Sequence, residues 1–226
     1  MARQMVRLSG LLKVALALAV VQAASVATAN EPCRIAVLGD SLITAHGLAV
    51  DEGFPAQLEQ RLRQEGYDCA VLDAGVGGDT TAGGLARLDW TLADRPSHVI
   101  VELGGNDGLR ALPPEQMEQN LDAIVSRLRA DDVPVLLAGM RAPPNLGRTY
   151  GEAFEAVFPR VAERHGVPLY PFFLDGVAGE PAYNQADGIH PTADGIAVIV
   201  ERILPAVTGW LDGSDEAGAA PTVGEG

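Results

Sequence analysis

Short apolar runs alternate with longer segments of helical periodicity over most of this 226-residue chain. The apolar runs, rich in Val, Ile and Leu, comprise residues 34–38, 69–73, 98–103, 134–139 and 167–172. The helical segments comprise residues 54–66, 80–94, 114–132, 150–166 and 196–207. Nearly continuous apolar runs are typical of strands buried on both faces of a parallel sheet. The alternation predicts an α/β fold, a three-layer α/β/α domain with a five-stranded parallel sheet. By analogy with doubly wound sheets we expect the strand order 2-1-3-4-5.

The two ends of the chain depart from this alternation. The segment MARQMVRLSGLLK is positively charged, VALALAVV is a short apolar run, and Ala27-Thr28-Ala29 supplies small residues for cleavage. Residues 1–29 are therefore expected to be a secretory signal peptide. An uncleaved anchor is the alternative, but the apolar run is far shorter than the ~20 residues that span a bilayer. Residues 30–211 are expected to form one domain, and the small, acidic stretch 212–226 a disordered tail.

Charge limits the partners of this protein. The formal charge of −14 becomes −17 without the signal peptide, because three of the 16 basic residues and none of the 30 acidic ones are removed. Nucleic acid and anionic lipid surfaces are thus disfavoured as partners. No other segment is apolar for long enough to cross a bilayer, so we expect no stable membrane insertion after processing. The expected location is the periplasm or the outside of the cell. Nothing in the sequence indicates an oligomeric state.

Both cysteines stand directly before or at the start of an apolar run. Cys33 precedes RIAVL and Cys69 precedes AVLD, so both are expected at the start of neighbouring strands. In an exported protein they can form a disulfide. Two free buried thiols are an equally consistent alternative, because the sequence does not show how closely the two Cα atoms approach.

Residues that follow the apolar runs are the candidates for chemistry, because ligands of open parallel sheets bind at the carboxyl ends of the strands. Ser41 follows the first run in Gly39-Asp40-Ser41, where it is either a turn cap or a nucleophile. Gly78 lies in the small-residue loop AGVGGDTTAGG after the second run, where it is either a packing residue or an N–H donor. This loop does not match a dinucleotide fingerprint, because Thr80 stands where the third glycine is needed. Asn106 after the third run is either a turn residue or an amide donor to a developing negative charge.

A carboxylate and an imidazole lie three positions apart in Asp187-Gly188-Ile189-His190-Pro191. Asp187 can orient His190, and Pro191 disfavours the helical conformation at His190 and can itself begin the next helix. The alternatives are a capping Asp or half of a metal site. No His or Cys with ligand spacing accompanies the pair, so we expect no metal here.

Taken together, these residues predict nucleophilic catalysis. A Ser hydroxyl is a weak nucleophile unless a base removes its proton and a third group holds that base. Ser41, His190 and Asp187 match those three roles. The backbone N–H groups of Ser41 and Gly78 and the amide of Asn106 match the donors that a tetrahedral oxyanion needs.

Four blocks of the sequence, GDSL, GGDT, GGND and DGIHP, resemble those of the SGNH or GDSL hydrolases, from about Arg34 to Leu211. The segments GDTTAGGLARL, VELGGNDGLR, MRAPPNLG and GVPLYPFFLDGVAG resemble an exported bacterial branch of multifunctional acyl-CoA thioesterase, lysophospholipase and arylesterase enzymes. The resemblance implies a flavodoxin-like sheet, no cofactor and five catalytic residues. It implies that Ser41 is the nucleophile, that Gly78 and Asn106 complete the oxyanion hole, that His190 is the base and that Asp187 orients it.

One stretch departs from that branch. LITAHGL stands where LTAGYGL is frequent, so Ala45 and His46 replace the usual Gly and Tyr. We interpret His46 as a surface or pocket residue, with a rival base as the alternative.

The expected substrates are small esters. Met140 and Leu146 in MRAPPNLG, together with Ile189, are candidates to line an apolar groove for an acyl chain. A rigid Pro-rich connection packed against the core is the alternative for that loop. The sequence thus predicts a serine esterase for aryl esters or lysophospholipids, with acyl thioesters as incidental substrates. The other functions considered are a carbohydrate O-acetyl esterase, which needs an aromatic sugar platform that two Trp residues hardly supply, and a noncatalytic binding module.

Overall fold

The fold was analysed in a computed structural model, which describes residues 33–213. The signal peptide expected at 1–29 and all but the first two residues of the tail expected at 212–226 lie outside the described residues. Within residues 33–213, no helix combines the length and the apolar character that crossing a membrane requires.

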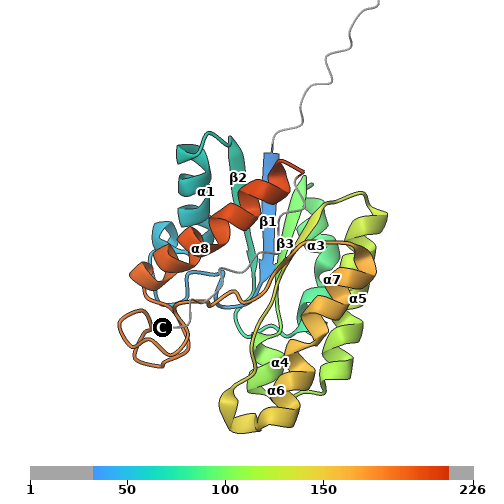
Figure 1. Cartoon of the computed structure of the whole chain (residues 1–226). Coiled ribbons are helices and arrows are strands. Elements are labelled where there is room, and N and C mark those ends of the chain that lie inside the picture. The colour runs from blue at the N-terminus through green and yellow to red at the C-terminus, as the bar shows by residue number, and fades with distance from the viewer. Residues whose placement is uncertain (1–32, 214–226) are drawn as a thin grey trace, which may run out of the picture. The chain divides into compact units, whose positions relative to one another are not determined.

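A five-stranded parallel sheet forms the centre of the described region, as predicted (Figure 1). Its strands are β1 (Cys33–Gly39), β2 (Cys69–Gly75), β3 (His98–Glu102), β4 (Val135–Ala138) and β5 (Leu169–Tyr170). The strand order is β2-β1-β3-β4-β5, which confirms the predicted 2-1-3-4-5 order. Strand β5 is shorter than the apolar run 167–172 that predicted it, because Pro168 and Pro171 flank it and have no N–H to donate.

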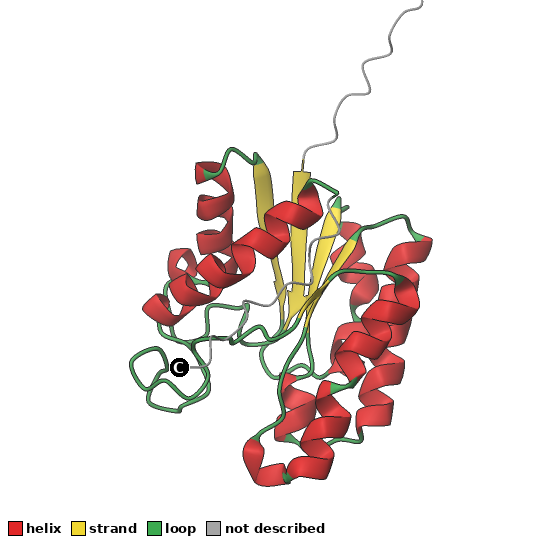
Figure 2. Ribbon diagram, viewed as in Figure 1, coloured by secondary structure: helices red, strands yellow, loops and turns green. Residues whose placement is uncertain are grey.

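Helices cover both faces of the sheet. They are α1 (Phe54–Gln64), α2 (Thr81–Ala86), α3 (Leu88–Ala93), α4 (Gly105–Leu109), α5 (Pro114–Ala130), α6 (Arg148–Glu155), α7 (Val157–His165) and α8 (Ala193–Leu211), with short 3-10 turns η1 (Val50–Glu52) and η2 (Pro144–Leu146). Helix α1 packs beside α8, and α5 packs beside α2 and α7. Figure 2 shows the two groups on opposite sides of the strands, so the fold has the predicted three layers.

Two of the predicted helices are each divided in two. The segment 150–166 breaks after Glu155, because Pro159 has no N–H for the carbonyl of Glu155. The segment 80–94 breaks at Arg87, whose side chain is held against the strand ends as described below. Helix α8 begins at Ala193 after the N-cap Thr192, so Pro191 precedes the helix and does not begin it. The prediction for Pro191 was wrong because the Thr192 hydroxyl accepts the N–H of Gly195 and so takes the capping position.

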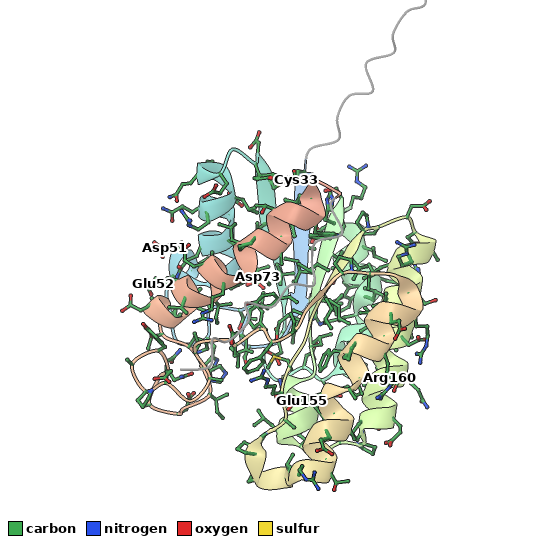
Figure 3. The ribbon with its side chains drawn as sticks, in the orientation of Figure 1. Cys33, Asp51, Glu52, Asp73, Glu155 and Arg160 are labelled. Atoms are coloured by element: carbon green, nitrogen blue, oxygen red, sulfur yellow. A yellow bond between two sulfur atoms is a disulfide. The ribbon has the colours of Figure 1, made fainter. Side chains whose placement is uncertain are left out.

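The two cysteines form a disulfide. Cys33 and Cys69 pair directly across β1 and β2, with their Cα atoms 4.5 Å apart. Figure 3 labels Cys33 at the beginning of β1. The bond therefore links the amino ends of two neighbouring strands, at the edge of the sheet opposite the residues predicted to carry chemistry.

Candidate active site

Three of the predicted residues form a hydrogen-bonded chain. The Nε2 atom of His190 lies 2.8 Å from Oγ of Ser41, and its Nδ1 atom lies 2.7 Å from Oδ2 of Asp187. A carboxylate only accepts hydrogen bonds, so Nδ1 carries the imidazole proton and Nε2 is left to accept the Ser41 hydroxyl. Ser41 follows β1, whereas Asp187 and His190 lie just before α8, with His190 149 positions further along the chain than Ser41. The geometry is that of a nucleophile, a base and a group that orients the base.

Asp187 accepts hydrogen bonds from backbone N–H groups as well as from the side chain of His190. Its Oδ1 atom accepts the backbone N–H groups of Ile189 at 2.9 Å and of His190 at 3.0 Å. The hydrogen bond from the His190 side chain, followed by these two backbone bonds, lowers the pKa of Asp187 well below its usual range. Asp187 therefore stays ionised at neutral pH, as the orienting role requires.

A tight turn places Ser41 at the tip of β1. The side chain of Asp40 accepts the N–H of Leu42 at 3.0 Å, and its carbonyl accepts the N–H of Ile43 at 3.2 Å. Gly39 permits close packing below the turn, since a Cβ at this position would lie 2.7 Å from Oε2 of Glu102. Only glycine therefore allows the side chains of Ile43 and Glu102 to approach the backbone this closely.

Asp40 also positions Asn106, a contact that the sequence analysis missed. The Asn106 Nδ2 atom, in the first turn of α4, donates to Oδ2 of Asp40 at 2.8 Å. An amide NH₂ has two hydrogens, so this bond occupies one of them and leaves the other available to a second acceptor. Asp40 is only 2% exposed, and burial raises its pKa. The only sequence signal for Asp40 was its position between Gly39 and Ser41, which indicated a turn residue and not a contact with Asn106.

The loop that holds Gly78 lies against the candidate nucleophile. A Cβ added to Gly77 would lie 4.0 Å from Cβ of Ser41. Gly78 has a φ of +80°, a conformation that favours glycine, and its carbonyl accepts Nη2 of Arg110 at 2.7 Å. The loop that holds Gly78 therefore lies beside the turn that carries Ser41, and Asn106 contacts that turn through Asp40.

Arg87 ties this loop to the strand ends, which the sequence analysis also missed. Its Nη2 atom donates to the Gly39 carbonyl at 2.8 Å and its Nη1 atom to the Ala74 carbonyl at 2.7 Å. Its Nε atom forms an ion pair with Asp79. One guanidinium thus links the end of β1, the end of β2 and the residue after Gly78. In sequence, Arg87 looked like an ordinary polar position of a helix.

Glu102 lies directly beneath the turn at the end of β3. It is 0% exposed, and within residues 33–213 neither carboxyl oxygen has a partner in good hydrogen-bond geometry, although the backbone N–H of Asp40 lies close enough to lower the pKa of Glu102 somewhat. Burial, followed by the nearby Asp40 carboxylate, raises the pKa of Glu102 well above its usual range. Glu102 is therefore best described as a neutral carboxylic acid, because an isolated buried charge is far more costly.

His46 stacks on the imidazole of His190. The two ring centroids are 4.0 Å apart and the rings are inclined by 28°. His46 is exposed, in keeping with its interpretation as a surface or pocket residue. The structure thereby brings a second imidazole to the Asp187–His190 pair, a partner that spacing along the chain did not reveal.

The three residues expected to contact an acyl chain lie in different environments. Ile189 is 44% exposed beside the candidate base, and Leu146 is half-buried in η2. Met140 is only 5% exposed and belongs to the core, so it lies beneath the surface of the site. Two further apolar side chains that the sequence analysis did not single out, Val76 after β2 and Leu109 in α4, are exposed at the same edge of the sheet.

The sequence matches a family model and several known proteins. The model of the GDSL-like Lipase/Acylhydrolase family matches residues 37–198, which contain all five candidate catalytic residues. Esterase TesA of Pseudomonas aeruginosa is 46% identical over 172 residues, 76% of this chain and 86% of that protein. Thioesterase 1/protease 1/lysophospholipase L1 of Escherichia coli K12 is 42% identical over 159 residues, 70% of this chain and 75% of that protein. A crystal structure of TesA superposes with a TM-score of 0.73 at 46% identity, covering 76% of this chain and 96% of that chain.

Proposed function

The chain belongs to the GDSL-like lipase/acylhydrolase family, and from that premise we propose that it is a serine esterase that cleaves carboxylic esters through an acyl-enzyme on Ser41. The observation that carries this proposal is the hydrogen-bonded chain from Ser41 through His190 to Asp187. A hydroxyl, an imidazole and an ionised carboxylate in this order are the parts that acyl transfer to serine requires.

In the first half-reaction, Oγ of Ser41 attacks the ester carbonyl carbon while Nε2 of His190 takes the hydroxyl proton. Asp187 stabilises the imidazolium that results, because it remains ionised and holds the Nδ1 proton. The tetrahedral intermediate then collapses, the bond to the alcohol oxygen breaks, and the leaving alcohol receives the proton from Nε2. An ester between the acyl group and Ser41 remains.

The negative charge on the carbonyl oxygen is stabilised by three donors from separate strand ends. They are the backbone N–H groups of Ser41 and Gly78 and the second hydrogen of the Asn106 amide. The bond from Asn106 to Asp40 fixes this amide before substrate binds. Preorganised donors of this kind stabilise the transition state without reorganising during the reaction.

In the second half-reaction a water molecule takes the place of the alcohol. His190 accepts a proton from the water, the hydroxide attacks the acyl carbon, and Ser41 leaves with the proton returned by His190. The carboxylic acid product is released and the free enzyme is restored. Every proton transfer in this cycle passes through His190.

Neutral or zwitterionic esters, such as aryl esters and lysophospholipids, are the proposed substrates. Exposed apolar side chains such as Ile189 lie beside the site, and the formal charge of −14 disfavours polyanionic substrates. The printed names of the relatives, an esterase and a thioesterase/lysophospholipase, support the same substrate class and include thioesters. We further propose that the protein is exported to the periplasm or beyond, which the Cys33–Cys69 disulfide supports, since disulfides persist in oxidising compartments.

The substitution Ser41→Ala tests the proposal. Hydrolysis of p-nitrophenyl butyrate should fall by roughly 10⁴-fold or more, and labelling by a fluorophosphonate probe should disappear. Ser126→Ala, which removes an exposed hydroxyl on α5, is the matched control and should keep both properties. A folded Ser41→Ala protein that retains most of the activity would refute the proposal.

A substrate panel separates the proposed esterase from a carbohydrate O-acetyl esterase. Rates on p-nitrophenyl esters of increasing chain length and on lysophosphatidylcholine should exceed the rate on acetylated xylan. The reverse ranking would favour the carbohydrate enzyme, and a complete lack of turnover with an unlabelled Ser41 would favour a binding module.

A further inference from the structure

One of the chain's four histidines, His46, lies against the candidate base. His98 begins β3 at the opposite edge of the sheet, and His165 ends α7 in a pair with Asp122. His46 stacks on His190 with 4.0 Å between the ring centroids. The proposed reaction uses Ser41, His190 and Asp187 but has no role for this second imidazole.

A single side chain holds the two histidine segments together. The Nε2 atom of Gln185 donates to the carbonyl of His46 at 2.8 Å and to the carbonyl of Pro191 at 2.9 Å. The backbone N–H of Gln185 donates to the carbonyl of His190 at 2.8 Å. The backbones that carry His46 and His190 are therefore fixed relative to each other, although the two residues lie far apart in the sequence.

Three metal-ligating side chains meet at this point. His46, Asp187 and His190 each offer one ligand atom, and these atoms all lie within 4.8 Å of one another. Two ligands of one tetrahedral Zn²⁺ ion are roughly 3.3 Å apart, given metal–ligand distances of about 2.0–2.1 Å. The imidazole of His46 is exposed and makes no hydrogen bond within residues 33–213. No side-chain hydrogen bond of His46 in the described part of the chain therefore has to break when this ring turns toward the other two ligands.

We propose that His46, Asp187 and His190 form an inhibitory site for a divalent transition metal, with Zn²⁺ as the reference ion. Two imidazoles and a carboxylate suit Zn²⁺ and Cu²⁺, whereas Mg²⁺ and Ca²⁺ prefer oxygen ligands alone. Water completes the coordination. The binding part of this inference stands on the geometry alone, and the inhibition part rests on the proposed function.

Occupation of the site is incompatible with the proposed reaction. Both nitrogens of His190 already have partners, since Nδ1 pairs with Asp187 and Nε2 pairs with Ser41. A metal bound through Nε2 removes the base from the hydroxyl, and a metal bound through Nδ1 removes the base from its orienting carboxylate. Metal binding and ester hydrolysis thus exclude each other, and chelation of the metal restores the base.

The first arm of the test measures binding without catalysis. ZnCl₂ is titrated calorimetrically into the mature Ser41→Ala protein, with excess MgCl₂ present to occupy sites built from oxygen ligands only. We expect one Zn²⁺ to bind per chain. An additional His46→Tyr substitution keeps an aromatic ring but removes the imidazole nitrogens, so it should weaken the affinity for Zn²⁺ at least about tenfold. An additional His165→Gln, which removes a histidine from α7, is the matched control and should leave the affinity unchanged. Equal affinities with and without His46→Tyr overturn the proposal.

The second arm measures inhibition of the enzyme with Ser41 intact. Zn²⁺ should suppress hydrolysis of p-nitrophenyl butyrate, EDTA should restore it, and Mg²⁺ should have no effect. The Zn²⁺ concentration for half-inhibition, measured relative to each variant's own metal-free rate, should rise at least about tenfold in His46→Tyr and stay unchanged in His165→Gln. Binding that depends on His46 without inhibition overturns the inhibitory role. Failure of the proposed function would give a different result from failure of the metal proposal, because Ser41→Ala would then retain its activity without metal.

Discussion

The amino edge of the parallel sheet, where its strands begin, and the carboxyl edge, where they end, differ sharply in the contacts that stabilise them. At the amino edge, the Cys33–Cys69 disulfide joins β1 to β2, and Trp210 of α8 packs edge-on against His98 with 5.0 Å between ring centroids. A cavity of about 330 Å³, lined in part by these two aromatic residues and Arg129, lies at this edge. At the carboxyl edge the same strands end in turns, and hydrogen bonds from polar side chains such as Asn106 and Arg87 connect these turns and strand ends.

Buried polar residues concentrate at the carboxyl edge. Asp40, Glu102, Asp107 and Thr81 are all buried at or just after strand ends. Asp107 is well satisfied, since it accepts the N–H and the hydroxyl of Thr81. Asp40 and Glu102 instead have raised pKa values that reflect the cost of burying a carboxylate. The candidate site therefore reduces stability locally, while the opposite edge supplies covalent and apolar stabilisation.

Removal of the disulfide should produce the largest change in the free energy of unfolding, and it should leave catalysis intact. Cys33→Ser with Cys69→Ser opens a loop with a sequence separation of 36 residues. On the chain-entropy model the free energy of unfolding should fall by roughly 4 kcal/mol, while kcat stays near that of the native protein. Urea denaturation and steady-state kinetics measure the two quantities. A large loss of kcat in a variant that remains folded would show that the two edges are coupled.

Asn106→Ala should produce the complementary result at the carboxyl edge. Loss of an oxyanion donor should lower kcat by roughly 10²- to 10³-fold, equivalent to about 3 kcal/mol of transition-state stabilisation. Stability should fall by roughly 1–3 kcal/mol, because the buried Asp40 carboxylate loses one hydrogen bond. Kinetics on an aryl ester and thermal denaturation distinguish the two effects. A kcat close to that of the native protein would remove Asn106 from the oxyanion hole.

Arg87→Met should lower both kcat and the free energy of unfolding, because this side chain joins the strand ends to the Gly78 loop. We expect kcat to fall by roughly 10- to 100-fold with little change in KM, since small displacements of catalytic groups are costly. The control is Arg160→Met on the outer face of α7, where Arg160 pairs with Glu118 and is labelled in Figure 3. That variant should retain its kcat. Equal kinetics for both variants would argue that Arg87 has no positioning role.

Glu102→Gln should give the smallest effect, and one that depends on pH. The folded-state pKa of Glu102 lies well above the reference value of 4.5, so the folded protein retains a proton that the unfolded chain releases. The native protein therefore loses stability as pH rises from about 4.5 through the raised pKa, and the neutral amide removes this loss. The variant's stability relative to the native protein should increase as pH rises from 5 to 8, because only the native protein has a buried proton to lose. Denaturation curves at several pH values measure the trend, and a difference that does not vary with pH would contradict a neutral Glu102.

The layers of the fold and the candidate residues at the strand ends were predictable from the sequence, whereas the strand order was expected by analogy with doubly wound sheets. Alternating apolar runs and helical segments predicted the sheet, and the turn residues after three runs identified Ser41, Gly78 and Asn106. Asp187 and His190 were recognisable because a carboxylate and an imidazole three positions apart share one short loop. All of these signals are local, since hydrophobic periodicity and turn chemistry depend on neighbouring residues.

Contacts between side chains that are distant in sequence became visible only in the three-dimensional structure. It selected the disulfide over two free thiols, placed Met140 in the core, divided a helix at Arg87 and stacked His46 on His190. Each of these outcomes depends on a distance between residues that lie on different segments. Such distances are set by how whole strands and helices pack in three dimensions, and a pattern of neighbouring residues along the chain does not contain them.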